Sequence, residues 1–357
     1  MRVVVLGATG NVGTSVIDAL AGDPRVDSIL GVARRLPDLD VAKTTWASAH
    51  IGRDDLVSLF RDADCVIHLA WLIQPSRDIE VLRSTNVEGS RRVFEAVAEA
   101  GVSSLVYASS IGAYSPGPKD EPVDESWPTD GIPSSFYSRH KAQTERMLDV
   151  FEVDHPEVRV VRLRPGLIFK REAASGIRRL FIGPFLPNAL VRRSLIPAVP
   201  EIDRLVFQAV HTEDVAEAYR LAATSDVAGA FNVAADPILD PAILATLLGA
   251  PLVPVPERAV RAGAWATWRM RLQPSPEGWV DMALQTPIMD TTRATKELGW
   301  SPRFTADYAL LELLEGIRDG AGFPTPPLAP ATSGPLRIRE LLTGVGRRSD
   351  TSGPAAR

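Results

Sequence analysis

The hydrophobic positions of the first 165 residues alternate between two kinds of segment. Short runs that are apolar almost throughout read as strands covered on both faces; they are residues 2–7, 28–33, 65–70, 104–109 and 158–164. Longer segments between them have apolar residues at helical spacing; they are residues 11–22, 54–63, 84–101 and 138–155. This alternation predicts an α/β fold, a doubly wound parallel sheet with helices on both faces.

The pattern changes after this first part. Residues 166–202 are irregular, and 203–235 offer one more strand and helix, which we expect to return to the sheet. Residues 236–325 contain short helical patterns and four of the seven tryptophans. We therefore expect a sheet domain over 1–165 with 203–235, and a smaller C-terminal substrate lobe built from the other two segments. The tail, 326–357, is rich in Pro, Gly and Ser, and we expect part of it to be disordered.

Composition narrows the class of protein. The net charge of −5 and the pI of about 5.7 give no basic field, so nucleic acid is not an expected partner. The single cysteine, Cys65, lies in an apolar run, which suggests a packed thiol and a reducing compartment. No apolar stretch reaches the roughly 18 residues that span a bilayer, and no signal peptide is visible. We expect a cytoplasmic protein that does not bind membranes.

Three glycines follow the first strand in the segment GATGNVG: Gly7, Gly10 and Gly13. In a dinucleotide site the first glycine permits a tight turn, the second lets the backbone approach a pyrophosphate, and the third allows close packing of helix on strand. The pyrophosphate would lie at the helix N-terminus. The spacing is not the common GxGxxG, and a purely structural turn is the alternative.

The end of the second strand bears on the type of cofactor. An acidic residue there would bind the ribose 2′-hydroxyl of NAD, but this chain has Arg34 and Arg35. Arginine can pair with a 2′-phosphate through several donors. The sequence therefore favours NADP, with NAD possible; the alternative is that these arginines are solvated loop charges.

Tyr137 and Lys141 stand four residues apart in a predicted helix, so they share one helix face. A phenol is a poor base at neutral pH, and a nearby cation lowers its pKa. Such a tyrosine can exchange a proton with an oxygen whose carbon exchanges hydride with a nicotinamide. Ser109 and Ser110 end a buried strand, at the edge where sites of open α/β sheets lie. Each of these features is common by itself, and an ordinary aromatic or loop serine is the alternative.

Taken together, these residues resemble the extended short-chain dehydrogenase/reductases, the NAD-dependent epimerase/dehydratase family. The resemblance covers roughly residues 1–320. It rests on segments in the family's order: GATGNVG, HLAW, TNVEG, SSIGAY, YSRHK, LRPG and VHTEDVAEAY.

The resemblance implies roles for the matching positions. Ser110 would polarise the substrate oxygen, Tyr137 would be the general acid/base, and Lys141 would bind the nicotinamide ribose and lower the pKa of the tyrosine. Besides these residues, the three glycines and the two arginines, the positions expected near the cofactor are Thr9, Asn11, Val12, Leu69, Ala70, Asn86, Pro165 and Gly166. Each could instead serve packing, and no metal ligand is assigned.

Departures from the family bear on the reaction. Ile111 and Gly112 follow Ser110, where the sugar-nucleotide dehydratases have an Asp-Glu pair, and RLRPGLIFK lacks the asparagine of many epimerases. We therefore expect an NAD(P)-dependent oxidoreductase that transfers hydride between nicotinamide and a secondary alcohol or ketone. The alternatives are a sugar-nucleotide epimerase with retained NAD and a non-catalytic NAD(P)-binding sensor.

The expected partners are a small-molecule substrate and a second copy of the chain. The segments 177–187 and 264–272 are apolar and aromatic with interspersed arginines, which would suit a partly hydrophobic substrate. Trp265 and Trp268 could equally be core or interface residues. Family members often form dimers through helices, so the resemblance implies a possible homodimer through the helices at 86–100 and 137–150.

Overall fold

The computed structural model describes residues 1–74, 76–183, 185, 188, 191 and 195–330, and most of the tail predicted at 326–357 lies outside this part. The centre of the fold is a seven-stranded sheet in which every pair of neighbours is parallel. From one edge to the other its strands are β11 (Gly229–Val233), β7 (Arg159–Pro165), β5 (Ser104–Ala108), β4 (Cys65–His68), β1 (Arg2–Leu6), β2 (Ser28–Ala33) and β3 (Thr44–Ser48).

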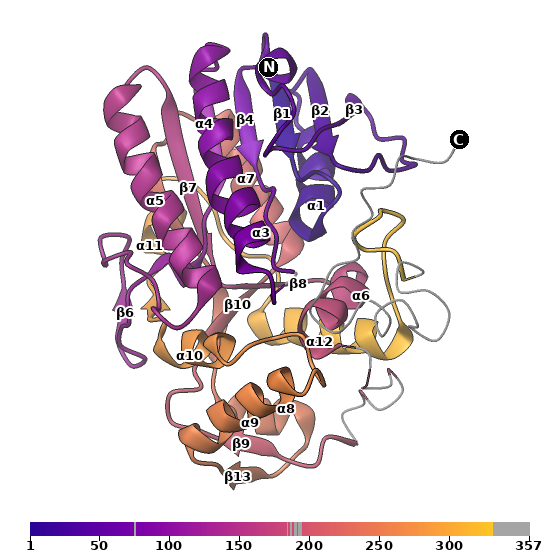
Figure 1. Ribbon diagram of the computed structural model, residues 1–357, viewed down its shortest axis with the longest axis vertical. Coiled ribbons are helices and arrows are strands. Elements are labelled where there is room, and N and C mark those ends of the chain that lie inside the picture. The colour runs from indigo at the N-terminus through magenta and orange to yellow at the C-terminus, as the bar shows by residue number, and fades with distance from the viewer. Residues whose placement is uncertain (75, 184, 186–187, 189–190, 192–194, 331–357) are drawn as a thin grey trace.

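Helices cover both faces of this sheet (Figure 1). One face packs against α1 (Asn11–Ala21) and α7 (Thr212–Thr224), which contact each other closely. The other face packs against α2, α4 and α5, which span Val57–Phe60, Gly89–Glu99 and Phe136–Asp154. The predicted doubly wound α/β class is confirmed.

The burial of each strand explains which strands the sequence reveals. All four residues of β4 are buried, as are four of the five in β1, so both appear in the sequence as unbroken apolar runs. The edge strand β3 is half-exposed and contains Thr44, Thr45 and Ser48. It is therefore absent from the five runs that the apolar pattern predicts.

We expected the strand within 203–235 to rejoin the main sheet, and this prediction is wrong in part. The first strand of that segment, β10 (Phe207–His211), lies in a separate three-stranded sheet between β12 (Ala235–Leu239) and β8 (Leu167–Phe169). The main sheet is completed instead by β11, which pairs with β7. Helix α7, between β10 and β11, returns to the face of the main sheet as expected.

The segments predicted to form the smaller lobe lie beyond the carboxyl ends of the strands, in the lower half of Figure 1. Its outer part contains β9 (Val199–Glu201), α8 (Pro241–Leu248), β13 (Leu252–Pro254) and α9 (Glu257–Arg269). The longer elements nearer the sheet are α10 (Gly278–Gln285) and α12 (Ala306–Asp319). The division into two lobes stays a prediction.

Short elements connect these parts. They are α3 (Ile79–Arg83), η1 (Ser84–Glu88), η2 (Ile111–Ala113), β6 (Pro122–Val123), η3 (Arg171–Ala173), α6 (Ala174–Ile177), η4 (Arg178–Ile182), β14 (Ile288–Met289) and α11 (Thr292–Lys296). Shortly after α11 the chain packs into the core under the sheet, where the Trp300 indole donates to the Asp214 carbonyl at 2.7 Å. None of the described helices is long and apolar enough to cross a membrane.

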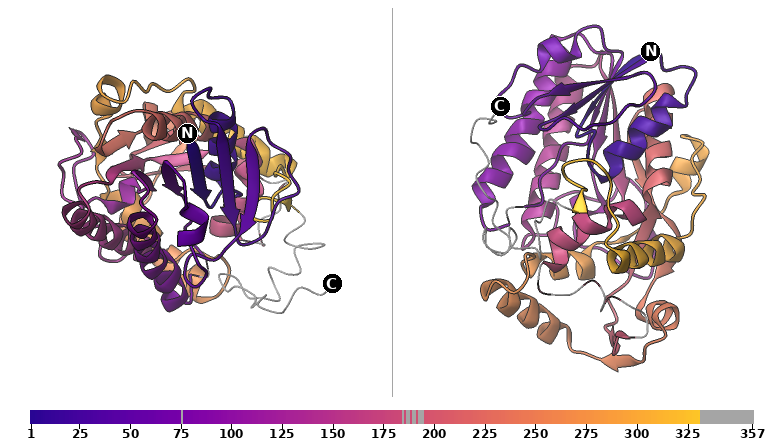
Figure 2. Two further views of the ribbon diagram at one scale, coloured as in Figure 1. Left: turned by 90° about the horizontal axis from the view of Figure 1, so that it is seen from above. Right: turned by 90° about the vertical axis from the view of Figure 1, so that its right-hand side faces the viewer.

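The segment that follows α12 lies beside α1, as the right-hand view of Figure 2 shows. The buried Thr325 hydroxyl donates to the Thr9 carbonyl at 2.9 Å, a contact across 316 positions of sequence. A late part of the chain therefore helps to hold the loop between β1 and α1.

Glycine is required where α1 meets that loop. Gly7 has φ of +82°, which suits glycine, and a Cβ on Gly13 would lie 2.3 Å from the Gly7 carbonyl oxygen. The third glycine of GATGNVG therefore allows the close approach that the sequence predicts.

We expect Gly13→Ala to destabilise the fold by about 1–3 kcal/mol, because the added methyl group overlaps backbone and forces a shift. Gly263→Ala is the matched control: it lies within α9 and a Cβ there meets nothing within 4 Å. The control should stabilise the protein slightly, since alanine favours a helix by roughly 0.5–1 kcal/mol over glycine. Urea unfolding measures both, and equal stabilities would contradict the packing role of Gly13.

Candidate active site

The glycine loop forms the floor of the candidate site. The Gly7 amide donates to the Val32 carbonyl at 2.9 Å, which ties the loop to the end of β2. Helix α1 follows Gly10 with no side-chain cap and no acidic residue in its first turn. An uncapped helix N-terminus without carboxylates suits a diphosphate, so the described residues fit the dinucleotide that the sequence predicts.

The other predicted cofactor positions are held at the same edge of the sheet. A Cβ on Gly7 would lie 2.8 Å from the Ala70 nitrogen and 2.9 Å from the Leu69 carbonyl carbon, so these residues adjoin the glycine loop. The buried Asn86 amide donates to the Leu72 carbonyl and accepts from the Leu72 amide, both at 2.7 Å. Asn86 thus fixes the backbone that follows β4 rather than pointing free into the site.

The remaining positions lie on either side of the loop. Pro165 and Gly166 are buried at the end of β7, where a Cβ on Gly166 would lie 2.6 Å from the Gln208 carbonyl oxygen. Asn11, in the first turn of α1, accepts a hydrogen bond from the Thr212 hydroxyl at 3.2 Å. Val12 is half-buried against the core of that face.

Arg34 and Arg35 come directly after β2 and are exposed. Their strand ends beside the glycine loop, because the Val32 carbonyl accepts from the amides of both Gly7 and Ala8. The two arginines therefore lie on the side of the glycine loop where the sequence predicts the adenosine end of the cofactor.

Tyr137 lies at the start of α5, next to Ser110 at the end of β5. The helix begins after Ser135, whose hydroxyl accepts from the Ser138 amide at 3.3 Å, so a serine cap fixes where the tyrosine emerges. Burial raises the pKa of Tyr137, and its hydrogen bond with Ser110 lowers that pKa in part. The structure thus brings the predicted serine and tyrosine together.

Lys141 lies one turn further along α5 and points towards β5. Its ammonium donates to the Ala108 carbonyl at 2.5 Å and lies 3.6 Å from the centre of the Trp71 ring, but 5.9 Å from that of Tyr137. Burial lowers the pKa of Lys141 to about 7, and the carboxylate of Glu145 opposes that shift. The pKa of Tyr137 is raised rather than lowered, opposite to the direction expected from the sequence.

A buried carboxylate, Glu145, lies one further turn along the same face and was not predicted. Arg164 donates to both of its oxygens at 2.9 Å, Arg162 donates to one at 3.0 Å, and the Ser109 hydroxyl donates to the other. Burial alone would raise the pKa of Glu145, but the bonds and charge of Arg164, with Arg162 and Ser109, lower it to about 2. This network joins α5 to β5 and β7.

Two tryptophans that the sequence did not single out flank Tyr137. The ring centre of Trp71 lies 6.0 Å from that of Tyr137, and the ring centre of Trp279 lies 5.0 Å away on α10. Trp71 stands in the quoted segment HLAW, but nothing in the sequence around Trp279 marks it. Trp265, considered for the pocket, is 49% exposed on α9, and Trp268 packs against Arg77.

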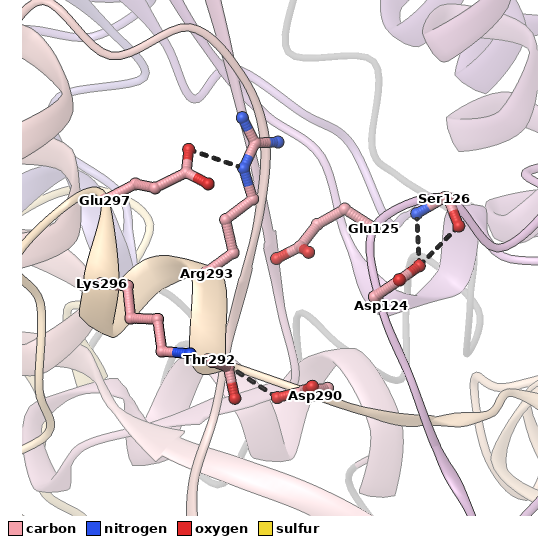
Figure 3. Close-up of a pocket in the computed structure, with 8 residues that line it drawn as sticks. All are labelled: Asp124, Glu125, Ser126, Asp290, Thr292, Arg293, Lys296 and Glu297. Carbon is pink, nitrogen blue, oxygen red and sulfur yellow. Dashed lines mark hydrogen bonds and ion pairs between the residues drawn. The ribbon is translucent and has the colours of Figure 1, made fainter.

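A separate pocket of about 410 Å³ lies away from this edge, beside β6 and α11 (Figure 3). It is lined by Asp124, Glu125, Ser126, Asp290, Thr292, Arg293, Lys296 and Glu297. Several of these groups pair with each other: Arg293 with Glu297 at 3.0 Å, and the Ser126 hydroxyl with Asp124 at 2.6 Å. The pocket contains none of the predicted site residues.

A parallel sheet with a glycine loop after β1, and with Ser110, Tyr137 and Lys141 at its carboxyl edge, defines an NAD(P)-binding Rossmann protein of the extended short-chain dehydrogenase/reductase class. The family model for "NAD dependent epimerase/dehydratase family" matches residues 3–234. The chain belongs to this family.

Two relatives match different shares of the chain. An uncharacterized protein of Mycobacterium tuberculosis is 25% identical over 325 residues, which are 90% of this chain but only 31% of that relative. An L-arabinose 1-dehydrogenase (NAD(P)(+)) of Haloferax volcanii is 34% identical over 112 residues, 30% of this chain and 41% of that one. The chain therefore spans less than a third of the first of these relatives and less than half of the second.

Solved structures share the fold. The UDP-glucose 4-epimerase of Thermus thermophilus, in complex with NAD, superposes with a TM-score of 0.65 at 21% identity, over 89% of this chain and 99% of that one. At this identity the likeness shows the fold and leaves the substrate open.

We expect Glu145→Gln to lower the free energy of unfolding at pH 7 by about 3 kcal/mol, because it breaks a buried charge network. The pKa of Glu145 is lowered to about 2, so its contribution is complete above the ordinary carboxyl pKa and lost as the pH falls through about 2. The difference between variant and wild type should therefore shrink as the medium is acidified.

The matched control is Glu152→Gln, which removes a half-exposed partner of the same Arg162. A partly exposed ion pair contributes about 1 kcal/mol or less. Urea unfolding at pH 7 and pH 3 compares both variants with wild type, and equal losses at pH 7 would refute the special role of Glu145.

Proposed function

We propose that the protein is an NADP-preferring oxidoreductase that interconverts a ketone and a secondary alcohol, with Tyr137 as the acid/base. The observation that supports this most is the convergence of Ser110, Tyr137 and Lys141 at one edge of the sheet. A protein that only binds a dinucleotide has no need of a tyrosine paired with a serine beside the cleft.

The residues would divide the work as follows. The nicotinamide cofactor, when bound, supplies or accepts the hydride. The Ser110 hydroxyl, fixed by its contact with the Gly112 amide at 3.0 Å, would hydrogen-bond the substrate oxygen and orient it. The Tyr137 hydroxyl would give a proton to that oxygen during reduction and take it back during oxidation. Lys141 would bind the ribose, and its positive charge near Tyr137 would stabilise the tyrosinate.

The preference for NADP is supported by charge. Arg34 and Arg35 directly follow β2, beside the glycine loop. A 2′-phosphate bound there would meet two guanidinium groups, and neither of these two positions carries a carboxylate that would repel it. The relative from Haloferax volcanii is described as using NAD(P)+, so use of either cofactor fits such a scaffold.

The second candidate is a sugar-nucleotide epimerase, which the fold shared with the Thermus thermophilus enzyme favours. An epimerase retains its NAD through the reaction, so NAD that purifies with the protein would support this candidate. Ile111 and Gly112 after Ser110 argue against the dehydratase branch. The sensor alternative predicts cofactor binding without turnover.

The partner expected from the resemblance is a second copy of the chain. Helices α4 and α5 contact each other, and Val150 and Val153 of α5 are exposed by 60% and 79%. Their position supports a homodimer through these helices, and a monomer mass in light scattering would contradict it.

We expect Tyr137→Phe to lower kcat by about 10²–10⁴-fold, the range for loss of general acid/base catalysis. Binding of NADPH should stay within about twofold of wild type, because the hydroxyl contributes a proton rather than cofactor contacts. Fluorescence titration of NADPH and turnover at 340 nm separate the two quantities. Equal loss of both would remove the role assigned to Tyr137.

We expect Arg34→Ala and Arg35→Ala, singly and together, to weaken NADPH binding about tenfold or more while changing NADH binding little, since a charged hydrogen bond is worth about 1.5–3 kcal/mol. Arg91→Ala is a suitable control, because its guanidinium pairs with Glu95 within α4, on a face of the sheet rather than at the end of β2. Parallel losses for both cofactors would contradict recognition of a 2′-phosphate.

A further inference from the structure

Aromatic groups from three distant parts of the chain gather beside Tyr137. Trp71 meets its ring edge-on, with 75° between the rings, and Trp279 lies at a tilt of 37°. Phe181 in turn packs on Trp279 at 4.9 Å with an angle of 87°. Aromatic rings at such distances attract each other and present flat apolar surfaces.

The three segments that supply these rings are tied together. The Gln74 amide donates to the Leu180 carbonyl at 3.0 Å, and the Ser76 hydroxyl donates to the Pro274 carbonyl at 2.5 Å. The Ser275 hydroxyl approaches the Phe181 carbonyl at 3.4 Å. These bonds join the loop after β4, the end of η4 and the segment before α10 into one wall, so the aromatic rings hold fixed positions.

Gly112 and Met282 pack closely beside the Tyr137 ring. A Cβ on Gly112 would lie 2.9 Å from the Tyr137 ring and 3.1 Å from the Met282 sulfur. The Tyr137 hydroxyl has a hydrogen bond with Ser110, and the Lys141 ammonium lies 5.9 Å from the centre of its ring. The polar groups of Ser110 and Lys141 therefore lie beside an apolar, aromatic frame.

Two polar atoms in this frame have no partner of their own. The indole nitrogens of Trp71 and Trp279 are buried and donate to no acceptor among the described residues. An indole N–H is a donor only, and buried donors are almost always paired. Both side chains are half-buried, so part of each ring remains accessible to a molecule that binds beside Tyr137.

We infer that Trp71 and Trp279 are specificity-determining walls of the substrate site, and that the substrate presents a flat, apolar ring system next to its reacting carbonyl or alcohol. The inference rests on the proposed function and names its substrate class: cyclic or aromatic ketones and alcohols. Oxygen atoms on such a ring would also give the two indole donors their acceptors. A strongly hydrated polyol would give up hydrogen bonds to water against these surfaces, and the apolar ring faces would not replace those hydrogen bonds.

The test is calorimetric binding of the bicyclic ketone 1-tetralone to the protein in the presence of NADP⁺, which cannot reduce it. Dihydroxyacetone is the small polar ketone for comparison, and UDP-glucose represents sugar nucleotides. Tetralone should bind at least about tenfold more tightly than dihydroxyacetone, a difference of the size that aromatic contacts and apolar burial provide.

Trp71→Leu and Trp279→Leu should each weaken tetralone binding about tenfold, and Trp279→Phe should restore most of it, because the ring is the relevant feature. The control Trp265→Leu, at an exposed position of α9, should leave it unchanged. Thermal unfolding of each variant verifies that the fold persists.

The outcomes separate the two claims. Tighter binding of dihydroxyacetone or UDP-glucose than of tetralone, or equal affinity in the leucine variants and wild type, would overturn the aromatic walls even if Tyr137-dependent reduction of another ketone is found. Tetralone binding that depends on Trp71 and Trp279 but leads to no NADPH oxidation would keep the walls and overturn the proposed reaction.

Discussion

A buried carboxylate holds α5, the helix that carries Tyr137 and Lys141, in place. Glu145 is fully buried, and without Arg164 and Arg162 its charge would be too costly to keep. Because positions 137, 141 and 145 follow one another at single helical turns, fixing Glu145 also fixes the rotation and height of Tyr137 and Lys141. The geometry of the candidate site therefore depends on an ion network that lies outside the cleft itself.

The same network also fixes the end of β5. Ser109 donates to Glu145, while its neighbour Ser110 faces Tyr137, since successive residues of an extended chain point in opposite directions. From Arg164 the network continues to the Tyr114 hydroxyl at 3.1 Å and from there to Asn232 on β11 at 2.6 Å. Three neighbouring strands and one helix are thus joined by buried polar contacts, and such supports hold a site to the precision that chemistry needs. The aromatic rings beside Tyr137, in contrast, come from the loop after β4, from η4 and from α10.

Local spacing explains what the sequence could predict. The glycine loop and the pair of Tyr137 and Lys141 depend on contacts within one turn or one helix, so their spacing reveals them. The strand at 207–211 was correctly located but assigned to the wrong sheet, because pairing partners are not encoded in a single apolar run. Glu145 and Trp279 were missed for the same reason. Their roles come from Arg164, 19 positions away, and from Tyr137, more than a hundred positions away, contacts that no local pattern contains.

The charge states of the site suit the proton transfer proposed for Tyr137. Burial raises the pKa of Tyr137, so the phenol keeps its proton at neutral pH and can give it to a developing alkoxide. Burial lowers the pKa of Lys141 to about 7, which leaves its charge sensitive to whatever enters the cleft beside Trp71. A bound anionic cofactor would favour the ammonium form and so stabilise the tyrosinate left behind after proton transfer. A protonated phenol before the hydride step and an ammonium beside the tyrosinate after it are what reduction of a ketone requires.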